Sequence, residues 1–205
     1  NKQGQEIGKH LNANGIPAIF LGNLLERPEV KDLISLMSLA VFHDGASLMR
    51  VSTSGNYRIN PTDSLTAYRE SQKNGSPLLD ELELLDLPEI ARLLTDINEL
   101  LLQNSPYLSI ARYLFNNSIL NHLSETEISV ENVVQRSSVC QFLNLLRSLP
   151  IDPESSPLEN MRSALGQIKR MAQPGFGPKL QIEDLSEIDA VQIMTIHSAK
   201  GLEYP

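Results

Sequence analysis

Apolar residues recur three and four positions apart along most of the chain, which is the spacing of one buried helical face. The pattern is clearest where Val30, Leu33 and Met37 follow Pro28, a residue suited to the first turn of a helix. We predict that this helix ends near His43. The same spacing predicts further helices over residues 5–14, 62–74, 88–104, 106–116, 132–149 and 157–172.

Two short segments have the composition of strands instead. Residues 17–21 form an apolar run after a proline, and residues 191–196 alternate in a run rich in branched side chains. The order is therefore helix and strand, a long helical middle, and a final strand. This is the layout of an α/β sheet with a helical domain inserted between two of its strands.

Charge and composition limit the classes of partner. The net charge is −8 and the pI is near 5.0, so bulk electrostatic attraction to nucleic acid is excluded and any DNA contact must be local. No apolar run approaches the roughly 18–20 residues of a membrane span. We expect a cytoplasmic protein without membrane contact. Because the chain lacks an initial methionine and ends directly after a strand pattern, we also expect it to be part of a longer protein.

No metal site or catalytic residue is predicted. The single cysteine, Cys140, lies in an apolar run and is expected in the core. The four histidines lack metal-ligand spacing, and the acidic stretches 80–86 and 183–189 lack the order of a calcium loop, so we expect solvated faces there.

The end of the chain contains the most specific pattern. Thr195-Ile-His-Ser-Ala-Lys-Gly-Leu-Glu203 follows the carboxyl end of the predicted strand, where α/β folds bind ligands. This segment resembles motif five of the UvrD-like, superfamily-one DNA helicases. Leu24-Leu-Glu-Arg-Pro-Glu-Val-Lys-Asp-Leu-Ile34 is similar to the segment that follows motif four in the same family.

The resemblance implies a mainly α chain in three parts. Residues 1–27 and 189–205 would be pieces of the second RecA-like motor domain, and residues 28–188 would be its inserted helical subdomain. Thr195, His197 and Ser198 would contact the DNA backbone, since hydroxyl and imidazole groups bind phosphate oxygens. Gly201 and Glu203 would contact the nucleotide, and Lys200 would pair with a phosphate or an acidic neighbour.

The implied activity is ATP-driven 3′-to-5′ movement on DNA in repair or recombination. ATP and Mg²⁺ would be cofactors of the longer protein, and its partners would be single-stranded DNA, junction DNA and repair proteins. The chain contains no Gly-x-x-x-x-Gly-Lys-Ser/Thr loop, so we expect that it does not hydrolyse ATP by itself. Two alternatives stay open: a non-catalytic protein-interaction module, and part of an AddA- or RecB-like helicase-nuclease subunit.

Three smaller predictions concern the helical middle. Glu26 and Arg27 are expected to pair with each other or to cap the helix at Pro28. Residues 52–56, flanked by Arg50, Tyr57 and Arg58, form a loop that either touches duplex DNA or is solvated. The aromatic residues of the helix at 106–116, Tyr107, Tyr113 and Phe115, are expected to pack in the core rather than stack on bases.

Overall fold

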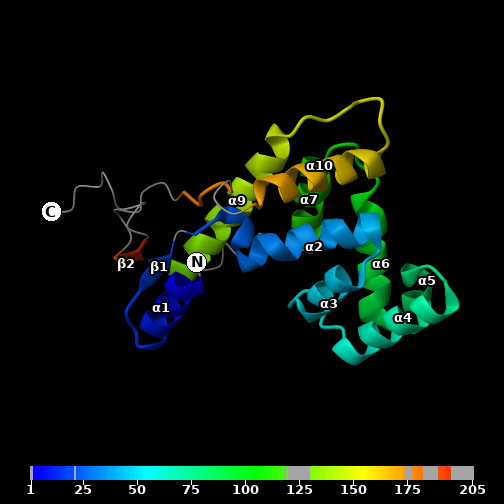
Figure 1. Ribbon diagram of the computed structural model, residues 1–205, viewed down its shortest axis with the longest axis horizontal. Helices are drawn as coiled ribbons and strands as arrows, with labels where there is room; N and C mark the ends of the chain where they lie inside the picture. Colours follow the sequence, from blue (N-terminus) through cyan, green and yellow to red (C-terminus); the bar gives the residue numbers. More distant parts are fainter. Residues whose placement is uncertain are drawn as a thin grey trace.

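The computed structural model describes residues 2–20, 22–117, 119, 130–173, 177–181 and 189–194. These parts are mainly α-helical, with one two-stranded parallel sheet (Figure 1). The predicted fold class is confirmed. None of the described helices is both long and apolar enough to cross a membrane.

The two strands are far apart in sequence and adjacent in space. Strand β1 (Ala18–Phe20) pairs in parallel with β2 (Val191–Ile193), and Ala18 lies opposite Val191. Helix α1 (Lys2–Ala13) packs on β1, and Gly4 gives the Phe20 ring room against it. The crossover between the strands contains all the remaining helices. The predicted order of helix, strand, helical middle and final strand is therefore confirmed. Strand β2 ends at Ile193, and residues 195 and 196 lie outside the described residues.

A helical body follows β1 in the sequence. Its first element is the short 3-10 helix η1 (Leu24–Glu26). The central helix is α2 (Pro28–Phe42), which packs on α3, α6, α9 and α10. Its proline is at the first helical position, and Val30, Met37 and Leu39 are fully buried. The other helices are α3 (Gly45–Thr53), α4 (Pro61–Asn74), α5 (Leu78–Glu83), α6 (Pro88–Leu100), α7 (Pro106–Asn116), α9 (Val130–Ser148) and α10 (Pro157–Met171).

The body has two groups of helices around α2. Helices α3, α4, α5 and α6 pack in sequence order on one side, and α7 and α10 pack together on the other, with α9 against α7 (Figure 1). Helix α10 begins with a reciprocal cap, in which Ser156 Oγ accepts from the Glu159 N–H and Glu159 accepts from the Ser156 N–H.

Helix starts and short helices differ most from the sequence prediction. The helix predicted over residues 62–74 begins one residue earlier, at Pro61, and its cap is Asn60, whose side chain accepts from the Thr62 N–H. Helix α3 also continues to Thr53, through residues expected to form a loop. Ser52 is buried there because its hydroxyl bonds Leu48 O and lies 2.6 Å from the Ser64 hydroxyl.

Candidate functional site

The predicted site segment begins directly after the described part of β2. Thr195, His197, Ser198, Lys200, Gly201 and Glu203 all lie outside the described residues. The structure fixes the strand that precedes them: β2 runs parallel to β1, and Met194 is the last described residue. The sequence therefore continues from the carboxyl end of a parallel strand, the end at which α/β sheets bind ligands.

A groove of about 610 Å³ lies where the strand pair joins the helical body, between α1, β1, η1, the start of α2 and the start of α9. Both kinds of charge line this neck groove. Its cations are Lys9, Arg27, Lys31 and Arg50, and its carboxylates are Glu26, Glu29 and Glu131. Its described lining residues have a formal charge of +1 (four cations minus three carboxylates), whereas the whole chain has −8. The neck groove is a local exception to the acidic character of the chain.

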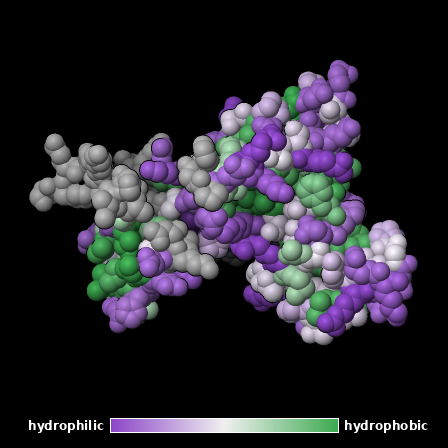
Figure 2. Space-filling view, in the orientation of Figure 1, coloured by the Kyte–Doolittle hydropathy of each residue, from purple (hydrophilic) through white to green (hydrophobic). Residues whose placement is uncertain are grey.

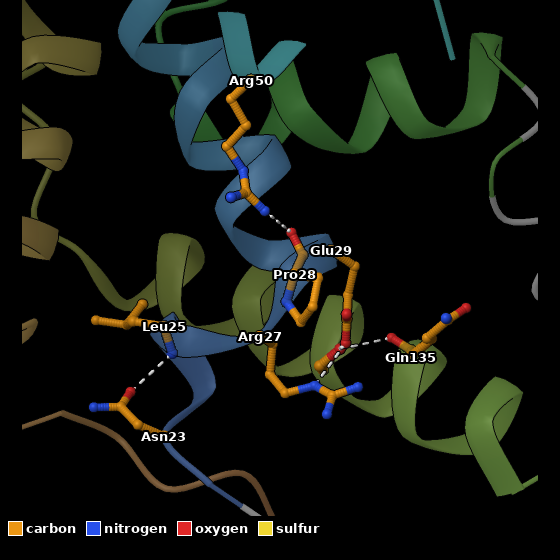
Figure 3. Close-up of polar contacts among 8 residues, drawn as sticks. Asn23, Leu25, Arg27, Pro28, Glu29, Arg50 and Gln135 are labelled. Atoms are coloured by element: carbon orange, nitrogen blue, oxygen red, sulfur yellow. Dashed lines mark hydrogen bonds and ion pairs between the residues drawn. The ribbon is translucent and has the colours of Figure 1, made fainter. Parts of the chain in front are cut away.

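The η1 segment reaches this position through backbone and side-chain bonds. Asn23 Oδ1 accepts from the Leu25 N–H at 2.8 Å, and Leu24 and Leu25 are buried (Figure 3). The segment that leads back from the helical body towards β2, residues 177–181, runs beside η1. Leu24 N–H donates to Pro178 O at 2.8 Å, and Leu180 N–H donates to Gly22 O at 3.1 Å. Residues 22–24 and 178–180, which connect the strand pair to the helical body, are thus bonded to each other as a short two-stranded ribbon.

Arg27 is the N-cap residue of α2, in agreement with one of the two predicted alternatives, although its side chain makes no capping bond. Its Nε donates to Glu29 Oε1 at 2.9 Å (Figure 3). Ser138 of α9 donates to the same carboxylate oxygen. Glu26 pairs with Lys31 at 2.5 Å. The predicted pairing of Glu26 with Arg27 is wrong, because consecutive side chains diverge and each finds a partner on the first turns of α2. Among the described residues, Glu29 is the hydrogen-bond partner of the Arg27 guanidinium, and the Arg27 side chain is 16% exposed.

Arg50 braces α3 against the start of α2. Its Nε lies 2.7 Å from Asp32 Oδ1, and its Nη2 donates to Pro28 O at 3.0 Å (Figure 3). Burial raises the pKa of Asp32, and the Arg50 charge opposes this effect. Arg50 was expected beside the loop at residues 52–56, and its side chain binds Pro28 and Asp32 at the start of α2.

A second polar cluster joins the loop after α3 to α6 and α7. Tyr57 donates to Asp96 Oδ2 at 2.7 Å, and its hydroxyl lies 3.4 Å from that of Tyr113. Asn117 Nδ2 donates to both carboxylate oxygens of Asp96, and the Arg92 guanidinium lies 6.0 Å from the Tyr57 ring centroid. Burial is the main reason why the pKa values of Tyr57 and Tyr113 are raised.

The aromatic residues in and near this cluster differ in burial, and only some of them follow the prediction. Tyr57 is buried and only Arg58 of the flanking pair is exposed, with its backbone in the left-handed region at φ 54°. Tyr113 packs in the core as predicted, and Tyr107 is half-buried against it. Phe115 is 78% exposed, so its predicted core position is wrong.

Cys140 is exposed, contrary to the core position expected from its apolar neighbours. Val139 and Phe142 are buried, and Cys140 faces away because one residue turns a helix by about 100°. Among the described residues, no group of three or more His, Cys, Asp or Glu side chains could hold a metal ion.

The whole chain, residues 1–205, matches the model of the UvrD-like helicase C-terminal domain. Two similar relatives are the ATP-dependent DNA helicases PcrA of Staphylococcus epidermidis and of Staphylococcus aureus strain Mu50. They are 24% identical over 222 and 220 residues, and each comparison covers 100% of this chain. The chain spans 29% of the length of these relatives.

Proposed function

The chain belongs to the UvrD-like helicase C-terminal domain family, and from this premise we propose that it serves in an ATP-dependent DNA helicase or translocase. Residues 1–27 and 189–205 would be parts of the second motor domain, and residues 28–188 its inserted helical subdomain. The longer protein would move 3′ to 5′ on single-stranded DNA during repair or recombination.

The observation that carries the proposal is the parallel pairing of β1 with β2 across the whole helical body. Parallel sheets are normally covered on both faces and have more strands than two. Apolar side chains gather over α1 and the adjoining strand region (Figure 2), and Ile7, Ile16 and Val191 are 44–52% exposed. These features fit a sheet whose other strands come from the remainder of the longer protein.

The neck groove supports DNA contact near the predicted site segment. A guanidinium held through Nε keeps two donors in a fixed plane, which matches the oxygens of a phosphate. Arg27 has this arrangement, and Lys9 and Lys31 line the same groove. We assign to Arg27 a phosphate contact to single-stranded DNA, alongside the contacts proposed for Thr195, His197 and Ser198.

Nucleotide binding is proposed for Gly201 and Glu203. A carboxylate accepts hydrogen bonds from ribose hydroxyls, and glycine lets the backbone approach phosphates. Hydrolysis of ATP bound with Mg²⁺ would supply the free energy for movement. The phosphate-binding loop would come from the other motor domain, because this sequence has none.

The test uses the full-length protein. Its ATPase activity should rise with single-stranded DNA, and it should unwind a duplex with a 3′ single-stranded tail but not one with a 5′ tail. A preference for the 5′ tail would refute the direction. ATPase activity that does not change when single-stranded DNA is added would refute the proposal of an ATP-dependent helicase or translocase.

A second measurement tests the groove. Arg27→Gln should weaken single-stranded DNA binding and lower the slope of log K against log salt by about 1, because one phosphate contact is lost. Lys73→Gln, an exposed lysine on α4 away from the groove, is the matched control. Equal salt slopes for wild type and Arg27→Gln would remove the phosphate contact.

A further inference from the structure

Residues 160–182 are a basic stretch in an acidic chain. They contain four cations and no carboxylate, which gives a formal charge of +4, whereas the whole chain has −8. The four cations are Arg162, Lys169, Arg170 and Lys179, and all of them are exposed. Among the residues that the structure describes, none of these side chains has an ion pair or a hydrogen bond. The stretch therefore presents positive charge that the described fold does not use.

The carboxylates on α10, and on the helices α2 and α7 that pack against it, already have partners. Hydrogen bonds from Ser156, and after them the charge of Arg162, lower the pKa of Glu159 in the first turn of α10. On α2, Glu29 and Asp32 each bind an arginine, and α7 has no acidic residue. The carboxylates of these helices thus leave the cations after Arg162 unmatched.

Gly166 interrupts the exposed side of α10. It lies one turn before Lys169 and Arg170, on the same face of the helix. Glycine inside a helix is less favourable than alanine, so it needs a reason. Packing against the described residues does not supply one, because a Cβ built on Gly166 would meet only Arg170 Nη1, at 3.9 Å, an ordinary contact. A missing side chain at this position lets an outside group approach the helix closely.

The helix dipole explains only part of this arrangement. Lys169 and Arg170 lie in the last turn of α10, where cations interact favourably with the dipole. That effect gives no reason for Gly166, or for a further cation at Lys179 in the segment beside η1. Helix α10 runs antiparallel to α2, and its last turn lies at the end of the body that faces the strand pair (Figure 1). We call Gly166, Lys169 and Arg170 the α10 face.

We propose that the α10 face binds the phosphate backbone of duplex DNA, as a contact separate from the neck groove. This inference rests on the proposed function. Cations that no carboxylate matches attract phosphates, and a guanidinium can bind two phosphate oxygens at once.

Two features of α10 favour a duplex over other partners. A single strand is usually held by stacking on aromatic rings, and α10 has no aromatic residue. A protein interface usually has an apolar centre, and the described part of α10 after Leu158 exposes no large apolar side chain. Contacts to phosphates alone, made by a rigid helix, are suited to the regular backbone of a duplex.

The test measures how binding of the full-length protein depends on salt, with relaxed circular duplex and with a single-stranded oligonucleotide as separate probes. The double variant Lys169→Gln, Arg170→Gln should lower the slope of log K against log salt by about 2 for the duplex, because two phosphate contacts are lost. Its slope for the single strand should stay that of wild type. The double variant Arg69→Gln, Lys73→Gln removes the same charge from exposed positions of α4 and is the matched control.

Gly166→Leu tests the shape of the α10 face without a change in charge. Leucine favours a helix more than glycine does, so the midpoint of thermal unfolding should stay the same or rise. Duplex affinity should nevertheless fall roughly three-fold or more, the size of one phosphate contact, because the added side chain keeps the backbone of the duplex away.

Three results would overturn the inference: an unchanged duplex slope in the α10 double variant, an equal drop in its α4 control, or full duplex affinity of Gly166→Leu. Loss of a protein partner with duplex binding intact would also overturn it. If Arg27→Gln still weakens single-strand binding in these cases, the proposed function stands without the α10 face. Absence of DNA binding by the wild type would end both.

Discussion

Asp96 is a carboxylate with only 9% of its surface exposed, and it has no direct ion pair among the described residues. Its carboxylate instead accepts hydrogen bonds from the Tyr57 hydroxyl and the Asn117 amide. The Arg92 guanidinium donates to the side-chain oxygen of Asn117. A buried charge needs such partners because desolvation costs several kcal/mol. The hydrogen bonds of Asp96 therefore join the loop after α3 to α6 and to the end of α7.

Removing the Tyr57 hydroxyl should therefore destabilise the fold. Tyr57→Phe should lower the free energy of unfolding by about 1.5–3 kcal/mol at neutral pH, the range for hydrogen bonds to charged groups. The measurement is urea unfolding. Tyr107→Phe is the matched control, because the described structure gives the Tyr107 hydroxyl no hydrogen bond. Equal losses in the two variants would contradict the role of the Asp96 bond.

The same tyrosine should also make stability fall in alkali. Burial raises the pKa of Tyr57 above the value near 10 of an unfolded chain, so only the unfolded state loses the proton as pH rises past about 10. The stabilisation is complete below that pH. Above it, the free energy of unfolding falls by about 1.4 kcal/mol per pH unit for each such group. Unfolding measured from pH 9 upward should decline less steeply in Tyr57→Phe than in wild type. Parallel curves would show that Tyr57 ionises equally in both states.

At the scale of elements, helices with a strong apolar repeat were predictable and short connecting elements were not. The repeat of α2 and the prolines that open α6, α7 and α10 identify those helices from sequence. Helix α5 has six residues, and η1 is held by Asn23 and by the distant residue Pro178. Contacts between residues that are about 150 positions apart have no local signal. The neck groove could not be predicted for the same reason.

The paired ribbon at the neck gives an element-scale prediction. A Cβ built on Gly177 would lie 1.8 Å from Asn23 Nδ2, so Gly177→Ala must displace the side chain that holds η1. The expected cost is about 1–3 kcal/mol, as for other overpacked sites. Gly55→Ala is the control, since nothing lies within 4 Å of its Cβ position. Thermal unfolding should separate the two variants, and a neutral Gly177→Ala would mean that the ribbon has room to shift.

At the scale of the whole molecule, the sequence predicted the fold class and the order of the elements, but it did not predict which side chains are exposed. The inserted layout followed from where strand-like and helix-like periods change along the chain. Cys140 and Phe115 were misplaced because apolar residues at the edge of a helical face look like those at its centre. Only the packing of α9 and α7 against their neighbours determines which edge residues are covered. The site residues from Thr195 to Glu203 stay a prediction from motif resemblance.

His197 connects this local segment to the behaviour of the full-length protein. If its imidazole binds a DNA phosphate beside β2, His197→Ala should raise roughly ten-fold the single-stranded DNA concentration needed for half-maximal ATPase stimulation. A hydrogen bond to a charged group contributes about 1.5–3 kcal/mol, and the lower end of this range corresponds to roughly ten-fold. ATPase activity without DNA should be unchanged, because the nucleotide contacts are assigned to Gly201 and Glu203. His10→Ala, at an exposed position of α1, is the matched control. An unaltered half-maximal concentration in His197→Ala would mean that the segment after β2 does not sense DNA through this residue.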